Sequence, residues 1–216
     1  TEERPFNRAE RSEVYRKSRG IDSTGAFGSL NEYDREEIKL RHSLFPTAHD
    51  QLVPYELKVG AARNLATTYT LHRPIMISAM SYGALSASAV EALSTGAKAA
   101  GILMNTGEGG FPKYHLLGGS DLIFQLGTAK FGVRHPDGRL NDEAFKKLCE
   151  NPEIKMIEIK LSQGAKPGKG GILPKEKISA EIAELRGVGR DHDVVSPPGH
   201  VECHDLASTV AFISHV

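Results

Sequence analysis

A lysine and a glycine-rich loop stand together in the second half of the chain. In residues 156–161, charged side chains alternate with apolar ones and Lys160 comes near the end, a pattern typical of a strand with one buried face. Residues 162–171 then contain four glycines and two lysines. Glycine lets backbone N–H groups approach a ligand and lysine supplies positive charge, so this stretch predicts a cofactor or anion site. A surface hairpin with solvated lysines is the alternative.

Lys160 and Glu108 are the candidate catalytic residues. A lysine at the end of a buried strand points into the end of the sheet, where an unpaired charge is costly. Lys160 therefore needs an anionic partner, and at about 4 Å with an effective dielectric near 20 their attraction is of the order of 4 kcal/mol. Glu108 lies between two glycines and is either a general base or a side chain that braces the backbone.

The spacing of the motifs disfavours other chemistries. The loop is no P-loop, because only three residues follow Gly164 before its Gly-Lys pair and no Ser or Thr comes after that pair. The dinucleotide fingerprint G-x-G-x-x-G is absent between the first predicted strand and helix. The histidines and aspartates of residues 191–205, His200 among them, match no standard metal-ligand spacing. We expect structural or surface roles for them and no metal site.

Composition limits the classes of partner. The 27 basic and 27 acidic side chains give zero net charge, which argues against nucleic acid or an acidic membrane as the main partner. Two cysteines are too few for a disulfide framework or an iron–sulfur site made by this chain alone. No apolar run approaches the roughly 20 residues of a membrane span. We expect a cytoplasmic protein; because the sequence starts at Thr1, membrane association through a missing N-terminal segment stays open.

The elements that must position these residues follow from local signals. Residues 1–70 are predicted to form a mostly irregular arm with a helix at 8–18 and short strands at 53–59 and 67–71. From residue 71, predicted strands alternate with helices that begin after Ser86, Asn141 and Ser179, which are good N-caps; the strands are 74–80, 102–105, 122–126, 156–161 and 193–196, and a last helix covers 206–216. This alternation predicts a parallel α/β fold with its ligand at the carboxyl ends of the strands. A barrel and an open sheet both fit.

Four motifs, in order, carry a family resemblance: residues 78–86 (SAMSYGALS), 105–110 (NTGEGG), 160–171 (KLSQGAKPGKGG) and 182–198 (IAELRGVGRDHDVVSPP). They resemble the FMN-binding synthase domain of glutamate synthase and its short single-domain relatives, and residues 4–15 resemble the arm that precedes the barrel in those relatives. The resemblance implies a (β/α)8 TIM barrel that holds FMN. Residues 71–216 would then be the N-terminal half of that barrel.

The resemblance also implies where the flavin binds. Ala79, Met80 and Ser81 would contact the isoalloxazine ring, and Gln125 would bond the edge of the ring. Lys160 would lie near the N1–O2 side of the flavin, where a cation stabilises the anionic reduced ring.

The substrate side follows from the same resemblance. Gly107, Lys166 and Arg186 match positions that hold 2-oxoglutarate, and a lysine with a bidentate arginine suits a dicarboxylate. The implied reaction reduces an imine, formed from a 2-oxo acid and ammonia, with hydride from the reduced flavin. Electrons would come from a reductase subunit or a ferredoxin-like protein. An iron–sulfur cluster is possible in the full-length family, but this chain has no cysteines for it.

The sequence also departs from the family. Ile172 and Phe111 replace a glutamine and a glutamate of the full-size enzymes, which questions 2-oxoglutarate as the substrate. Only about five strands are predicted before the last residue, whereas a barrel has eight. We therefore expect a fragment, or an oligomer or complex in which another chain completes the barrel. A non-catalytic flavin-barrel scaffold is the main alternative, and a phosphate-binding barrel enzyme without flavin is a third.

Overall fold

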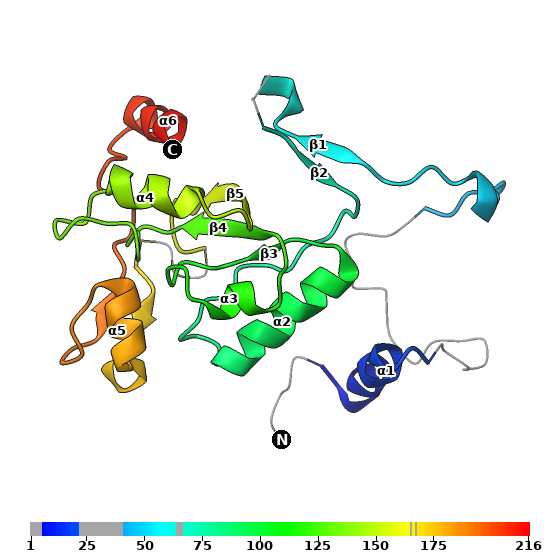
Figure 1. Ribbon diagram of the computed structural model, residues 1–216, viewed down its shortest axis with the longest axis horizontal. Coiled ribbons are helices and arrows are strands. Elements are labelled where there is room, and N and C mark those ends of the chain that lie inside the picture. Colours follow the sequence, from blue (N-terminus) through cyan, green and yellow to red (C-terminus); the bar gives the residue numbers. More distant parts are fainter. Residues whose placement is uncertain (1–5, 22–40, 64–66, 165, 167) are drawn as a thin grey trace. The chain divides into compact units, whose positions relative to one another are not determined.

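The chain folds into two compact units, Thr1–Leu52 and Val53–Val216. The structure is a computed structural model that describes residues 6–21, 41–63, 67–164, 166 and 168–216. Figure 1 traces both units, coloured along the sequence.

The first unit contains helix α1, Arg8–Ser18. The Asn7 side chain accepts a hydrogen bond from Glu10 N at 3.0 Å, and Glu10 Oε2 accepts one from Asn7 N at 2.6 Å. This capping box satisfies N–H groups that the first turn leaves unpaired, and it confirms the helix predicted at 8–18. A 3-10 turn covers His49–Gln51. Much of the irregular stretch predicted for the arm, residues 22–40, lies outside the described residues.

The second unit opens with a two-stranded antiparallel sheet. Strand β1, Leu57–Val59, pairs with strand β2, Tyr69–Leu71. A 3-10 turn, Ala61–Arg63, follows β1. The strands predicted at 53–59 and 67–71 are therefore present, but shorter, because only the paired residues count as strand.

Helix α2, Ala87–Ala100, covers one side of the next strands. Ser86 caps its first turn and Gly101, at φ 63°, ends it in the left-handed conformation that glycine adopts without strain. Strand β3, Met104–Asn105, follows. Val90 and Ala97 of α2 are buried against Met104, so the apolar stripe of the helix fixes the strand beneath it.

Strands β3, β4 and β5 form a parallel sheet in that order (Figure 1). Strand β4 is Leu122–Leu126 and strand β5 is Ile154–Ile159. A short helix, α3 (Tyr114–Leu117), lies between β3 and β4 in the sequence and packs on α2. The parallel arrangement confirms the α/β class.

Two helices pack against one face of β4 and β5. Helix α4 is Asp142–Cys149 and helix α6 is Leu206–His215. Their residues Phe145 and Phe212 share a core with Phe124 of β4. Side chains of a strand alternate between faces, so Ile157 and Ile159 of β5 join this core while Glu158 between them points to the other face.

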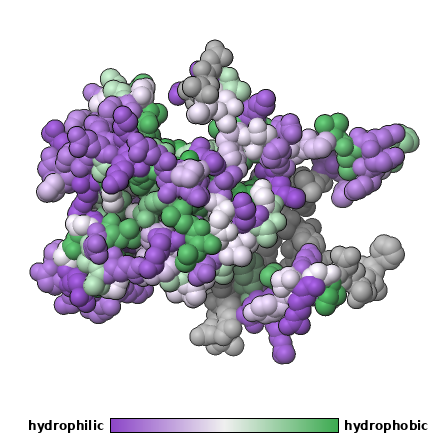
Figure 2. Space-filling view, in the orientation of Figure 1, coloured by the Kyte–Doolittle hydropathy of each residue, from purple (hydrophilic) through white to green (hydrophobic). Residues whose placement is uncertain are grey.

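Helix α5, Ala180–Arg186, is the helix predicted after Ser179, and it stops at Gly187, again left-handed. In the space-filling view, hydrophobic residues reach the surface between α4 and α5 (Figure 2). A pocket of about 410 Å³ opens there, with Leu148 of α4 and Leu185 of α5 in its lining. No described helix has the length and apolar character that crossing a membrane requires.

The first strand predicted for the barrel, residues 74–80, is reduced to one bridge. Ile77 pairs in parallel with Met104 of β3, and no other described strand pairs with this segment. Ile75 and Met76 are exposed. Backbone hydrogen bonds still join the segment to the β3 region, from Ile77 N to Leu103 O and from Met80 N to Asn105 O.

The strand predicted at 193–196 exists but belongs to a different sheet. Strand β7, Val194–Val195, pairs antiparallel with strand β6, Ile172–Leu173. The described parallel sheet thus has three strands rather than five. The hydrogen bond from Ser196 N to Gly171 O, at 2.8 Å, continues the pairing of β7 with β6. The prolines that follow Ser196 lack the N–H groups that a longer strand needs, so the strand ends there. A 3-10 turn, Lys175–Lys177, follows β6.

Candidate active site

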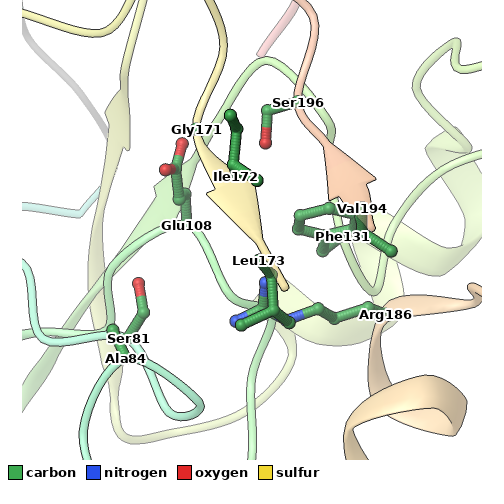
Figure 3. A pocket seen from close by; sticks show the side chains of 10 residues that line it. All are labelled: Ser81, Ala84, Glu108, Phe131, Gly171, Ile172, Leu173, Arg186, Val194 and Ser196. Atoms are coloured by element: carbon green, nitrogen blue, oxygen red, sulfur yellow. The ribbon is translucent and has the colours of Figure 1, made fainter. Parts of the chain in front are cut away.

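A pocket of about 110 Å³ lies where the loops after the parallel strands meet the β6–β7 sheet (Figure 3). Its lining comes from six separate segments: Ser81, Ala84, Glu108, Phe131, Gly171, Ile172, Leu173, Arg186, Val194 and Ser196. The polar groups approach from different directions, with the Glu108 carboxylate on one side and the Arg186 guanidinium on another. Such convergence of charged groups on a concave surface is typical of a binding site.

Glu108 is the anionic partner that the position of Lys160 requires. Lys160 Nζ lies 3.4 Å from Glu108 Oε1, and both side chains are largely removed from water. Gln163 Nε2 donates to both carboxylate oxygens, at 2.8 and 2.7 Å. A Cβ at Gly127 would lie 2.6 Å from Glu108 Cβ, so that glycine leaves the room that the glutamate occupies. The carboxylate is therefore held in place rather than solvated freely.

Gly107 places Glu108 beside the loop that carries Ser81. Its φ of 69° lies in the left-handed region, and a Cβ there would lie 2.6 Å from Ser81 N. Gly107 N donates to Asn105 Oδ1 at 2.9 Å. Both the conformation and the space therefore require glycine.

Arg186 is the cation that lines the pocket. It is only 6% exposed, its Nη2 donates to Tyr82 O at 2.9 Å, and its guanidinium lies 5.1 Å from the centre of the Phe131 ring. Its Nε is buried and has no hydrogen-bond partner in the described part of the chain. Burial lowers the pKa of this guanidinium, and the charge of Glu108 acts in the opposite direction.

A group of polar side chains lies on the parallel sheet, on residues that come shortly before those of the site in the sequence. Glu158 Oε1 accepts hydrogen bonds from Asn105 Nδ2, at 2.9 Å, and from Gln125 Nε2. Gln125 is buried, yet its Oε1 has no partner among the described residues. These side chains come from β3, β4 and β5 and share the face opposite the helices. An acceptor that is buried without a donor indicates a place for a ligand.

The remaining predicted residues divide into two groups. Met80 is half-buried and its carbonyl accepts from His115 Nε2 at 2.9 Å, and Ser81 lines the pocket. Ala79 and Lys166 are exposed, and neither lines the pocket. The structure thus brings Ser81, Gly107, Glu108, Lys160 and Arg186 together, whereas Lys166 does not join Arg186.

His200 contacts the site in a way that sequence reasoning did not predict. It is buried, and its Nε2 lies 3.0 Å from Lys160 O, a carbonyl to which it must donate. Burial lowers the pKa of His200, and the charge of Lys130 lowers it further. Lys130 itself forms an ion pair of 2.8 Å with Glu202. The sequence around His200 is rich in His and Asp. It suggested structural or surface roles and gave no sign of this contact.

Gln163 and Phe131 also had no distinguishing signal in the sequence. Gln163 lies in the glycine-rich loop and contacts Glu108, and Phe131 lies in the turn after β4. Within the described ranges, no group of three His, Cys, Asp or Glu side chains is arranged to hold a metal ion.

Known proteins are similar to this sequence over most of its length. Residues 13–216 match the family model described as the conserved region in glutamate synthase. The chain is 33% identical to the glutamate synthase large subunit-like protein YerD of Bacillus subtilis over 250 residues, 98% of this chain and 47% of that protein. It is 41% identical to the archaeal glutamate synthase (NADPH) of Methanocaldococcus jannaschii over 153 residues, 71% of this chain and 26% of that protein.

A third relative, the glutamate synthase large subunit-like protein of Rhizobium meliloti, is 36% identical over 127 residues, 59% of this chain and 26% of that protein. The chain spans about half or less of the length of these relatives. Because the family model covers nearly the whole chain, the chain belongs to the glutamate synthase family.

Proposed function

We propose that this chain is part of an FMN-dependent oxidoreductase that converts a 2-oxo acid and ammonia into an amino acid. The observation that carries the proposal is the Glu108–Lys160 pair, 3.4 Å apart, whose carboxylate lines the same pocket as the buried guanidinium of Arg186. A carboxylate, an ammonium and a guanidinium suit a substrate that carries an acid group and exchanges protons. Membership of the glutamate synthase family supports the redox assignment.

The residues present fit the flavin. Gln125 offers a buried acceptor without a donor, which suits an N–H group of a ligand. The pocket of about 110 Å³ is smaller than the roughly 300 Å³ at which typical ligand pockets begin, so it suits a small acid rather than a flavin. We propose that Ala79, Met80, Ser81, Gln125 and Lys160 hold FMN on the polar side of the sheet. Bound there, FMN would supply the electron pair that reduces the C=N bond.

The side chains of the pocket have separate roles in this proposal. Arg186 binds the carboxylate of the 2-oxo acid, since its buried Nε still has a hydrogen to donate. Glu108 takes up and returns a proton at the substrate nitrogen, and Lys160 holds that carboxylate in position through their ion pair. The reaction consumes one 2-oxo acid, one ammonia, two electrons and two protons, and releases one amino acid and one water.

Further strands and an electron donor complete the proposal. Strand β5 pairs only with β4 among the described strands, so its outer edge offers unpaired backbone groups. We propose that additional strands pair with this edge and close a (β/α)8 barrel. The electrons come from a reductase subunit or an electron-transfer protein.

A visible absorbance spectrum of the purified full-length protein tests the cofactor assignment. We expect a flavin spectrum, release of FMN on denaturation, and formation of an amino acid when a 2-oxo acid, ammonia and a chemical reductant are added. A colourless protein that takes up no added FMN would overturn the proposal.

The alternative is a flavin-barrel scaffold without turnover. The exposure of Lys166 away from the pocket favours it, because the pocket then lacks one of the two cations implied for a dicarboxylate. Retention of FMN together with no amination of any 2-oxo acid would support the scaffold.

A further inference from the structure

One wall of the pocket is aliphatic and faces the charged side. Ile172 and Leu173 of β6 and Val194 of β7 form it, together with the Phe131 ring (Figure 3). Leu173, Val194 and Phe131 belong to one buried cluster, backed by Ile182 of α5. Ile172 is 56% exposed; as the strand neighbour of Leu173 it points to the opposite face of β6, and it lines the pocket from there. The wall is thus an apolar surface with a solid core behind it.

The backbone that carries Ile172 is fixed from two sides. A Cβ at Gly170 would overlap the carbonyl of Ser196, and a Cβ at Gly171 would lie 3.1 Å from Glu108 Oε1. Ser196 N also donates to Gly171 O at 2.8 Å. The backbone before Ile172 is therefore packed against Ser196 and Glu108 and hydrogen-bonded to Ser196, which keeps Ile172 at the pocket.

The cations near the pocket are already accounted for. Arg186 lines it, and Lys160 is paired with Glu108. Lys166 and Lys169 are exposed and do not line it. A second carboxylate on the substrate would therefore be desolvated against the aliphatic wall or would face the like charge of Glu108.

We infer that the substrate is a 2-oxo acid with one carboxylate and an aliphatic side chain, and that Ile172 determines this specificity. This inference rests on the proposed function. Arg186 takes the carboxylate next to the oxo group, and the aliphatic side chain packs on Ile172, Leu173 and Val194. Contact of this kind discriminates by about 10- to 200-fold for each methylene that is gained or lost.

The test compares 2-oxoisocaproate with 2-oxoglutarate in the purified full-length protein. Amination is measured with ammonia and dithionite as the electron source, and binding without ammonia is measured by calorimetry. We expect kcat/KM and affinity to favour 2-oxoisocaproate by about 10-fold or more. In Ile172→Gln, the amide can hydrogen-bond a second carboxylate, so the preference should fall by about 10-fold.

Two further variants make the comparison specific. Ile75→Gln makes the same change at an isoleucine that is 63% exposed and outside the pocket, and it should leave the preference unchanged. Ile172→Val keeps the aliphatic wall and should keep the preference as well.

The outcomes separate this inference from the proposed function. A wild-type preference for 2-oxoglutarate, or equal preferences in Ile172→Gln and Ile75→Gln, overturns the inference alone. Absence of binding and turnover with every 2-oxo acid, in a protein that retains flavin, overturns the proposed function and the inference with it.

Discussion

Glu108 is held by more contacts than any other polar group described in the pocket. Lys160 and Gln163 both bind its carboxylate, and Gly127 and Gly171 leave the space for it. A side chain constrained in this way loses little entropy when a substrate binds, which suits a proton-transfer group. Its environment also explains why Lys160 tolerates partial burial.

Replacement of Glu108 by glutamine tests its role directly. Glu108→Gln keeps the size of the side chain but removes the proton acceptor, so kcat for amination should fall by about 100-fold or more. Steady-state kinetics would measure the loss, and the absorbance spectrum should show that flavin is still bound. Glu143→Gln, on the exposed side of α4, is the matched control and should leave kcat unchanged. Unchanged kcat in Glu108→Gln would rule out proton transfer by this residue.

Two glycines with similar backbone angles differ in what surrounds them. Gly107 has φ 69° and Gly101 has φ 63°, but only at Gly107 would a Cβ meet Ser81. Gly101→Ala should lower the free energy of unfolding by about 1 kcal/mol, the cost of the left-handed conformation. Gly107→Ala should lose a further 1–3 kcal/mol, roughly, from overpacking. Urea unfolding measures both, and equal losses would show that the contact with Ser81 does not matter.

At the scale of elements, the turn after β4 is joined to the segment before α6 by a buried ion pair. Lys130 is fully buried and its Nζ lies 2.8 Å from Glu202. Thr128 Oγ1 also donates to Pro197 O at 2.7 Å. These contacts hold the segment that carries His200, and through His200 they reach the backbone of Lys160.

Removal of one partner should therefore destabilise the fold strongly. In Glu202→Gln the buried charge of Lys130 is left without its counter-charge, so the free energy of unfolding should fall by about 3 kcal/mol. Asp137→Asn is the control, because the Asp137–Arg139 pair is exposed and such pairs contribute about 0–1 kcal/mol. Denaturant unfolding compares the variants; a loss in Glu202→Gln no larger than the control would show that the ion pair does not hold the two segments.

The elements also show how far the sequence predicts the structure. Helices α2, α4 and α5 were found because the caps Ser86, Asn141 and Ser179 and an apolar stripe are local signals, and the structure confirms each of these caps. The segment predicted as a strand at 74–80 forms only one bridge to β3, and the strand at 193–196 pairs with β6 instead of joining the parallel sheet, since pairing depends on segments far away in the sequence. The residues of a strand do not show which other strand it pairs with.

The site follows the same rule. Lys160, Glu108 and Arg186 were each singled out from their own neighbourhoods, and the structure brings them together. That Glu108 is the partner of Lys160 could not be predicted, because 51 residues separate them and only the fold of the sheet joins them. The contact of His200 could not be predicted for the same reason: its partner is a backbone carbonyl, which leaves no trace in the residue types.

At the scale of the whole second unit, two buried histidines make stability depend on pH. Burial lowers the pKa of His115 and of His200, whereas histidines of an unfolded chain titrate near about 6.5. Below about pH 6.5 the unfolded state binds more protons than the folded state. The contribution of these histidines to the free energy of unfolding is therefore fully present above that pH and is lost as the pH falls.

Unfolding experiments between about pH 7.5 and 5.5 test this dependence, in a range that lies above the titration of ordinary carboxyl groups. The free energy of unfolding should decrease steadily toward the acidic end. In His200→Gln, which keeps a donor for Lys160 O, the decrease should be smaller than in the wild type. A free energy that stays constant over this range would mean that neither histidine is held in the neutral form.

The closeness of Gly170 to the carbonyl of Ser196 has a consequence for how this protein can evolve. No substituent fits at Gly170, whereas no described atom lies within 4 Å of the position that a Cβ would take at Gly164. In a library that randomises each position, Gly170 should therefore accept no replacement, while Gly164 accepts many. Substitutions can therefore accumulate at Gly164 over evolution, while Gly170 stays fixed beside Ser196.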